Sequence, residues 1–399
     1  MREAEIAIVG AGLAGSTAAA MLGQAGHRTV LIDAHATYPV DFRCEKLDGS
    51  QVSLLRRTGL ADAVLNAATP YPEIWVARFG RVVEKRRDSQ CGIRYHDLVN
   101  TVRSQIPRGT EFIHAKASAI AAGPDRQTIA LSNGEEVSAR LVVVANGLNS
   151  GLRQKLGMRC EELSAAHSLS IGFDVKPLHR RGFDFPALTY FPEQPSRIAY
   201  LTLFPIGDIM RANLFVYCGA RDPWLALLRE TPRDALLASL PGLGSLIGAF
   251  EVAGDVRIRP ADLYVSKGKR RPGVVLVGDA FATSCPAAGT GLNKVFTDVE
   301  RLCRIHVPHW LASPGMGEDK IADFYDDPVK RACDAHSLSK AHFLRSLSTN
   351  AALPWRIRRW GRSVGHIGAA VFRNTRERLP LKAPHRDEAG SNLTSGNPS

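Results

Sequence analysis

The sequence predicts an α/β protein in which a Rossmann-like domain with a parallel sheet is interleaved with a mostly antiparallel β-sheet domain, followed by C-terminal helices. Three observations predict this fold class. Residues 5–33 (EIAIVGAGLAGSTAAAMLGQAGHRTVLID) show the pattern of strand, glycine turn, helix and strand. Residues 198–207 (IAYLTLFPIG) have the apolar and aromatic composition of a strand. Residues 273–279 (GVVLVGD) return to the buried-strand pattern of the N-terminus.

The first βαβ unit follows from local composition. Ile6, Ile8 and Val9 form a short apolar run of the kind found in buried parallel strands. The alanine-rich segment 13–23 has high helix propensity, and the glycine of the following Ala-Gly-His ends it. Residues 28–33 predict the second strand, and we expect a right-handed crossover between the two strands.

The remaining elements are predicted in chain order. Residues 53–65 (SLLRRTGLADAVL) predict a helix, and residues 110–147 predict successive strands with turns at GPD and SNGEE. ALTYF, IAYLTLFPIG and ANLFVYCG predict an antiparallel sheet, and the chain is helical from Gly291 onward. We predict a nucleotide-binding domain in two parts, residues 1–159 and 265–310, with a substrate domain at 160–264 between them. A helical region at 311–377 and a disordered tail at 378–399 follow.

Composition excludes several protein classes. Of the 399 residues 45% are hydrophobic and 23% are charged, which is typical of a globular protein with a sizeable core. The net charge of +12 is spread along the chain without a nucleic-acid-binding module, so we expect no nucleic-acid partner. Seven scattered cysteines without Cys-x-x-Cys, and histidines without ligand spacing, predict reduced thiols in a cytoplasmic protein and no metal site.

Gly10, Gly12 and Gly15 form Gly-x-Gly-x-x-Gly between a predicted strand and a predicted helix. The first glycine permits a tight turn, the second lets a pyrophosphate approach the backbone, and the third lets the helix pack on the strand. The free amides of Leu13 and Ala14 would face the phosphates, assisted by the helix dipole. Asp33 ends the second strand at the position where an acid accepts from a ribose hydroxyl. This combination predicts a dinucleotide site, for NAD or FAD.

A second glycine-rich stretch, GDAFATSCPAAGTGLN at 278–293, distinguishes between these nucleotides. It resembles the second flavin motif of the single-component FAD-dependent aromatic hydroxylases, the p-hydroxybenzoate hydroxylase family of class A flavoprotein monooxygenases. The resemblance implies that the Rossmann-like domain binds FAD. It also implies that Asp279, after Gly278, holds the ribityl chain and that Pro286 lies beside the isoalloxazine ring. The implied contacts to the flavin N1/O2 edge come from the backbone amides of Gly289, Thr290, Gly291, Leu292 and Asn293. A helix beginning near Thr290 would aim its positive end at that edge.

A third segment, NGLNSGLR at 146–153, is similar to the family's Asp-Gly-x-x-Ser-x-x-Arg motif. Asn146 replaces the usual Asp, which preserves the turn chemistry but removes a charge. The family associates this motif with both FAD and NAD(P)H, so the replacement leaves NADH and NADPH both open as electron donor. Two other departures are Ala282 in place of a usual His and Thr290 in place of a frequent Gln. Arg43 (DFRCEK) and Arg94 (GIRYHDL) match the family's two FAD-contacting arginine regions, with a solvated surface arginine as the alternative for each.

The resemblance implies a monooxygenase. NADH or NADPH would reduce FAD, O2 would add at flavin C4a, and the hydroperoxide would hydroxylate an electron-rich small organic substrate. The first alternative is a reductase or dehydrogenase of the geranylgeranyl-reductase kind. A flavin-dependent halogenase is a further alternative, but this chain lacks the Trp-x-Trp-x-Ile-Pro signature of the tryptophan-type enzymes. The net positive charge leaves a FAD- or nucleic-acid-binding protein without turnover as another alternative. Tyr190, Phe191, Phe204 and Pro205 are candidates for substrate contacts, although the burial typical of aromatic residues favours ordinary sheet core for each. No motif identifies a catalytic acid or base.

The basic segment 352–373 (ALPWRIRRWGRSVGHIGAAVFR) spaces apolar residues near a helical period beside arginines. Such a stripe either lies on an anionic membrane surface or packs on its own protein. No apolar run is long enough to span a bilayer. We therefore expect a cytoplasmic protein, with peripheral contact to the inner face of a membrane as an added possibility for this segment.

Overall fold

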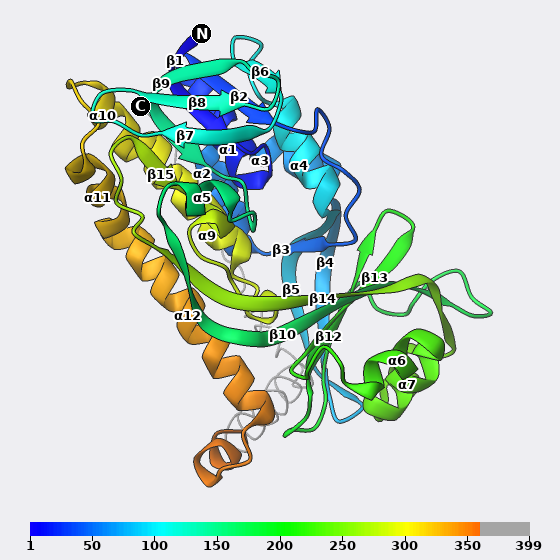
Figure 1. Cartoon of the computed structure of the whole chain (residues 1–399). Coiled ribbons are helices and arrows are strands. Elements are labelled where there is room, and N and C mark those ends of the chain that lie inside the picture. Colours follow the sequence, from blue (N-terminus) through cyan, green and yellow to red (C-terminus); the bar gives the residue numbers. More distant parts are fainter. Residues whose placement is uncertain (360–399) are drawn as a thin grey trace, which may run out of the picture.

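The computed structural model describes residues 1–359, in which two β-sheets lie side by side (Figure 1). This arrangement confirms the predicted α/β fold class. The predictions for residues 360–377 and for the tail at 378–399 lie outside the described residues. No helix within residues 1–359 has the length and hydropathy needed to cross a membrane.

The first sheet has the strand order β6-β2-β1-β9-β8-β7, and β15 pairs with the C-terminal residues of β9. The pairs of β1 with β2 and β9, of β2 with β6 and of β9 with β15 are parallel, whereas β7, β8 and β9 pair antiparallel. Its strands are β1 (Arg2–Val9), β2 (Thr29–Asp33), β6 (Glu111–His114), β7 (Ala117–Ala121), β8 (Gln127–Leu131), β9 (Glu136–Val144) and β15 (Val274–Leu276).

The second sheet has the order β14-β10-β13-β12-β11-β4-β5-β3, and every pair except β11 with β4 is antiparallel. It includes strands from residues 44–94, which the sequence placed within the first part of the FAD-binding domain, so the domain boundaries stay a prediction. Its strands are β3 (Cys44–Leu47), β4 (Thr69–Arg78), β5 (Arg81–Arg94), β10 (Arg159–Pro177), β11 (Leu188–Phe191), β12 (Ile198–Ile206), β13 (Ile209–Val216) and β14 (Phe250–Lys267).

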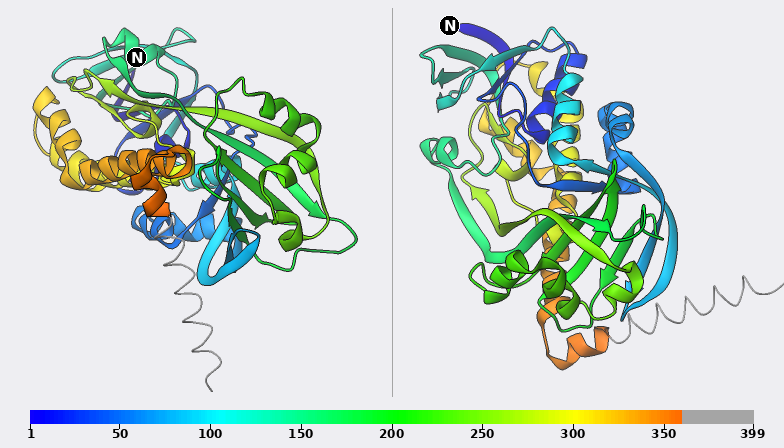
Figure 2. Two further views of the ribbon diagram at one scale, coloured as in Figure 1. Left: turned by 90° about the horizontal axis from the view of Figure 1, so that it is seen from below. Right: turned by 90° about the vertical axis from the view of Figure 1, so that its right-hand side faces the viewer.

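Helices cover both sheets. The view from below shows α12 and the pair α6 and α7 on opposite sides of the second sheet (Figure 2). The α-helices are α1 (Leu13–Gln24), α2 (Gly49–Thr58), α3 (Ala61–Ala67), α4 (Tyr95–Ser104), α5 (Gly151–Lys155), α6 (Pro223–Glu230), α7 (Pro232–Ser239), α8 (Leu243–Ile247), α9 (Gly291–Arg301), α10 (Val307–Leu311), α11 (Glu318–Asp326) and α12 (Pro328–Thr349). Three short turns of other helix types are η1 (Gly278–Ala280), η2 (Pro286–Ala288) and the π-helical η3 (Leu302–His306).

The long helix α12 joins the two sheets. Its first half packs against α9 beside the first sheet, and its Ser348 carbonyl accepts from the Ser196 amide at the far end of the second sheet. Beyond α12 the chain folds back, because Trp355 packs on Phe343 and the buried Arg359 donates to the Asn350 carbonyl at 2.7 Å. Helix α12 therefore runs along both parts of the molecule (Figure 1).

Candidate functional site

The first glycine turn depends on the absence of side chains at two positions. Gly10 has a φ of +99°, and a Cβ there would lie 2.6 Å from the Ala145 carbonyl oxygen. A Cβ at Gly15 would overlap the Gly10 carbonyl oxygen, because α1 begins directly against the end of β1. On the side that faces the sheet, backbone atoms therefore leave no room for a side chain, and only glycine fits at both positions.

The same turn is open on its other side. A Cβ at Gly12 would meet no atom within 4 Å, and Gly12 caps α1 without a side-chain hydrogen bond. The amides of Leu13 and Ala14 lie in the first turn of α1, where a helix offers no internal partner. Open space beside unpartnered helix-start amides is a favourable site for a phosphate group.

Asp33 lies at the end of β2 beside this turn. Its carboxylate accepts from the Ala11 amide at 2.6 Å and from the His35 amide at 2.8 Å. Arg103 of α4, which the sequence did not single out, donates to the Ala11 carbonyl at 2.8 Å and forms an ion pair with Asp33 at 3.9 Å. Arg103 also donates to the His35 carbonyl and thereby fastens the turn to the loop after β2.

The second glycine turn meets the first. The position that a Cβ would take at Gly278 is 3.3 Å from the Ala14 Cβ. Leu13 at the start of α1 and Leu292 at the start of α9 share one buried apolar cluster with Leu47. Residues more than 260 positions apart in the sequence therefore form one continuous surface that contains the starts of two helices.

Asp279 occupies the turn between β15 and η2. Its side chain is half-buried, and its carboxylate has no hydrogen bond or ion pair with any other residue in the described part of the chain. Burial raises the pKa of Asp279, while Arg43, Lys294 and Arg259 oppose the rise. The carboxylate is thus able to accept hydrogen bonds from a ligand hydroxyl.

The loop from Pro286 to Asn293 leads into α9. Gly289 has a φ of +62° with no atom within 4 Å of its Cβ position, and Thr290 caps α9 without a side-chain hydrogen bond to the helix. The amides of Gly291, Leu292 and Asn293 consequently have no partner within the helix.

Gln51, a residue that the sequence did not point to, supports this loop. Its side-chain nitrogen lies 3.2 Å from the Gly289 carbonyl oxygen and 3.2 Å from the Asn293 side-chain oxygen. Gln51 is itself held by the capping box that it forms with Asp48 at the start of α2. Helix α2 therefore holds the loop at Gly289 and Asn293.

The third motif connects the two turns. The Asn146 side-chain oxygen is buried and has no hydrogen-bond partner within residues 1–359. Arg153, which is 1% exposed, donates to the Ala280 carbonyl at 2.5 Å and to the Leu148 carbonyl at 3.2 Å. The motif arginine thus fastens η1 to the segment that carries Asn146.

The two predicted arginines differ in their surroundings. Arg43 is half-buried, donates to Asp41 at 2.7 Å and stacks on the Tyr95 ring at 3.8 Å, and its charge opposes the rise in the pKa of Asp279. Arg94 caps α4 with an exposed side chain that makes no hydrogen bond or ion pair within residues 1–359. Its contact with FAD stays a prediction, whereas Arg103 of the same helix contacts the nucleotide turn.

A further acid, Glu45, lies near Arg43 and Asp279. Burial raises the pKa of Glu45 to about 7, Arg43 opposes this rise, and Asp41 and Asp279 add to it. Its neighbour Cys44 points the other way, because the Cys44 sulfur accepts from Arg211 of β13 at 3.0 Å. The short strand β3, at the edge of the second sheet, thus places Glu45 and Cys44 on opposite faces.

The aromatic candidates lie in different places. Tyr190 is 1% exposed and packs on the face of the second sheet that α6, α7 and α8 cover, so the prediction that it lines a substrate pocket is corrected. Phe204 and Pro205 pack against Gly92 of β5. Phe191 lies on the opposite face from Tyr190, 5.6 Å from the ring of Tyr200.

The arrangement fits a flavin dinucleotide. It offers two helix starts with unpartnered amides, open space at Gly12 and Gly289, a half-buried acid at Asp279 and an unsatisfied buried oxygen on Asn146. An extended anionic nucleotide with ribityl hydroxyls and a polar ring edge matches this set of donors and acceptors.

Comparison with known proteins assigns the class. The model of the FAD binding domain family matches residues 3–309, so the chain belongs to this family and FAD is its cofactor. The resemblance to the class A flavoprotein monooxygenases is confirmed, and the protein is a FAD-dependent oxidoreductase.

Individual relatives are distant but nearly full-length. The 3-demethoxyubiquinol 3-hydroxylase of Escherichia coli (strain K12) is 27% identical over 380 residues, which cover 87% of this chain and 94% of the relative. The digeranylgeranylglycerophospholipid reductase of Thermoplasma volcanium is 26% identical over 411 residues, covering 86% and 96%. The crystal structure of p-nitrophenol 4-monooxygenase PnpA from Pseudomonas putida DLL-E4 has a TM-score of 0.71 at 19% identity, covering 90% and 92%, and shows the shared fold.

Proposed function

We propose that the protein is a hydroxylase that uses NAD(P)H and O2 to insert one oxygen atom into an electron-rich aromatic or quinol-like substrate. The bound FAD supplies the redox chemistry, taking electrons from the nicotinamide nucleotide and passing one oxygen atom to the substrate. The protein's part is to bind and orient both molecules and to exclude water.

One observation carries this proposal. On the face of the second sheet opposite α6–α8, the rings of Phe191, Tyr200 and Phe215 follow one another at centroid distances of 5.6 and 4.9 Å. The Tyr200 hydroxyl donates to the Ala287 carbonyl at 2.6 Å, which joins this aromatic wall to the loop that carries Pro286. An aromatic wall beside the proposed ring site favours a flat apolar substrate.

The names of the relatives support the same chemistry. The Escherichia coli relative is named for hydroxylation of a quinol, and the Pseudomonas putida structure for monooxygenation of p-nitrophenol. The reductase from Thermoplasma volcanium is the basis for the second candidate, which is flavin-dependent reduction of an isoprenoid double bond without oxygen.

Isotope labelling separates the two candidates. We expect the FAD-loaded enzyme, given NADPH or NADH and a panel of phenols and quinols under 18O2, to form a product that carries one 18O atom. The measurement is the product mass, with 16O2 as control. Turnover of the substrate without O2 would favour the reductase, and oxidation of the nucleotide with only hydrogen peroxide formed would contradict the hydroxylase.

We further propose that the end of the molecule beyond α12 contacts an anionic membrane surface, where quinol-like substrates are found. Leu353 is 64% and Ile357 is 60% exposed, and exposed Arg356 and Arg358 lie beside them. Apolar side chains flanked by arginines are suited to a lipid headgroup region.

Vesicle sedimentation tests this contact. We expect the protein to co-sediment with vesicles of phosphatidylglycerol and phosphatidylcholine at low salt, and the variant Leu353→Ser/Ile357→Ser to lose about tenfold in affinity. The substitution Leu227→Ser, at another exposed leucine, serves as control. Equal sedimentation of all three proteins, or none by the parent protein, would contradict the contact.

A further inference from the structure

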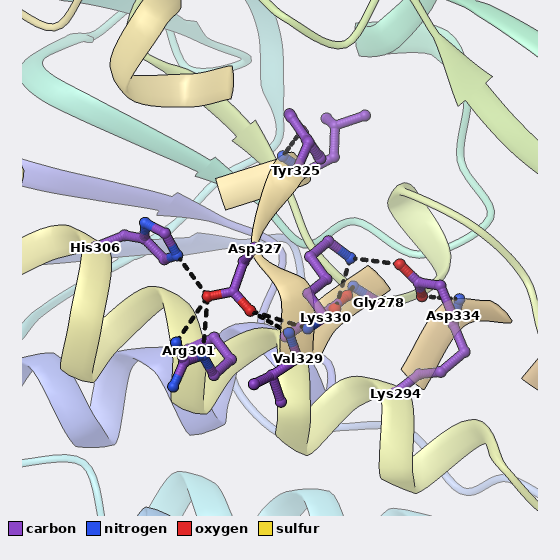
Figure 3. Close-up of polar contacts among 11 residues, drawn as sticks. Gly278, Lys294, Arg301, His306, Tyr325, Asp327, Val329, Lys330 and Asp334 are labelled. Atoms are coloured by element: carbon purple, nitrogen blue, oxygen red, sulfur yellow. Dashed lines mark hydrogen bonds and ion pairs between the residues drawn. The ribbon is translucent and has the colours of Figure 1, made fainter. Parts of the chain in front are cut away.

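Helices α9 and α12 are joined by a ladder of polar side chains (Figure 3). The two helices run antiparallel, so residues at helical spacing on one meet residues at helical spacing on the other. The four rungs are Thr290 with Ser337 at 2.7 Å, Lys294 with Asp334 at 2.7 Å, Asp298 with Lys330 at 2.7 Å, and Arg301 with Asp327 at 2.8 Å.

The ladder covers the whole length of α9. Its first rung lies at Thr290, the residue that caps the helix start in the candidate site. Its last rung is joined by His306, whose ring nitrogen is 3.1 Å from the same Asp327 carboxylate oxygen. Asp327 also accepts from the Val329 and Lys330 amides and caps α12. The end of α9 and the start of α12 therefore share one carboxylate.

The third rung reaches the flavin turn directly. Lys330 and Asp298 are 0% and 1% exposed, and the second Asp298 carboxylate oxygen accepts from the Gly278 amide at 3.0 Å. Gly278 precedes Asp279 and lies against Ala14 of the first turn. A continuous chain of polar contacts thus runs from Lys330 through Asp298 to the backbone of the motif.

Stability alone does not explain a buried ion pair at this place. Desolvation of two charges offsets much of their attraction, and apolar side chains of similar size pack two helices as well. A hydrogen-bonded pair differs from apolar packing in that it fixes distance and register. Here the fixed element is the peptide between β15 and Asp279.

We propose that Asp298, which Lys330 holds in place, is a positioning residue for the flavin: its side-chain oxygen holds the Gly278–Asp279 peptide at a set distance from the start of α9. This inference rests on the proposed flavin site. The Asp279 carboxylate and the amides of residues 291–293 can then bind one cofactor without rearranging, which lowers the free-energy cost of binding.

Two charge-neutral double variants isolate the contact. Lys330→Met/Asp298→Asn removes both charges but keeps a side-chain oxygen for the Gly278 amide, whereas Lys330→Met/Asp298→Leu removes that oxygen as well. We expect the first to bind FAD within about threefold of the parent protein and the second to bind about 10- to 100-fold more weakly. The readout is the dissociation constant of FAD from apoprotein, measured by quenching of flavin fluorescence.

Thermal unfolding of the apoproteins separates positioning from folding. Equal FAD affinity of the two double variants would overturn the proposal, as would a loss of FAD affinity in proportion to a loss of apoprotein stability. The exposed pair Lys267–Glu161 supplies the control Lys267→Met/Glu161→Gln, for which we expect no change.

A second variant keeps the test decisive if the leucine variant does not fold. Thr290→Val/Ser337→Ala removes the first rung with little change of volume, and we expect about 3- to 10-fold weaker FAD binding. Unchanged binding would overturn the proposal. Oxygen insertion is not used as a readout, so failure of the hydroxylase assignment would leave these results interpretable.

Discussion

Gly12→Val is expected to yield a folded protein that binds FAD at least about 100-fold more weakly and is purified without it. The position has an ordinary backbone conformation, with φ of −70°, and no atom lies within 4 Å of the added Cβ, so the fold has room for valine. The valine side chain would occupy the space in front of the Leu13 and Ala14 amides. Loss of two charge-assisted hydrogen bonds to phosphate weakens binding by about 100-fold or more. Visible absorbance of the purified protein and FAD titration of the apoprotein measure the effect.

Gly109→Val is the matched control. Gly109 likewise has open space around its Cβ position and no positive φ, but it lies in the exposed loop between α4 and β6. We expect full flavin content in this control and an unchanged melting temperature of both apoproteins. A Gly12→Val protein with one FAD per chain would contradict the assignment of the first turn to the pyrophosphate.

Asp279→Ala is expected to change cofactor binding and apoprotein stability in opposite directions. Loss of a carboxylate that accepts from ribityl hydroxyls weakens FAD binding by about 10- to 100-fold. Because burial raises the pKa of this carboxyl, the folded apoprotein binds its proton more tightly than the unfolded chain does. Stability is therefore lost as pH rises through the raised value, and alanine removes that loss.

The measurements for this variant are FAD titration and apoprotein melting across pH. We expect the alanine apoprotein to melt above the parent protein at pH 8 and to approach it at pH 4. The isosteric variant Asp279→Asn should bind FAD with intermediate affinity, since its amide oxygen still accepts hydrogen bonds. Parent-like affinity of Asp279→Ala would show that this acid does not hold the cofactor.

The parts of the fold that were predictable are those set by local composition. The glycine turns at 10–15 and 289–291 restrict which residues fit, so a strand, a turn and a helix follow from a few positions. The apolar runs of β1, β2 and β15 identify a buried parallel sheet for the same reason.

The remaining features depend on contacts between distant segments. Arg94 is exposed at the start of α4, whereas Arg103 in the last turn of the same helix contacts Ala11, which no sequence motif indicates. Tyr190 lies on the face of its sheet that α6, α7 and α8 cover. Which face it takes depends on how β11 pairs with its neighbouring strands, and the sequence of β11 alone does not show this. Gln51 and Lys330 carry no sequence signal, because their roles arise from partners more than thirty residues away.

The central claim is that two distant glycine turns hold one FAD molecule, the first at its pyrophosphate and the second at its ribityl chain and ring. A crystal structure of the protein grown with FAD tests it most directly. We predict the pyrophosphate within hydrogen-bond distance of the Leu13 and Ala14 amides, a ribityl hydroxyl on Asp279 and the pyrimidine edge of the ring at the amides of residues 291–293. FAD bound with its pyrophosphate away from residues 10–15, or with its ring away from the start of α9, would contradict the account.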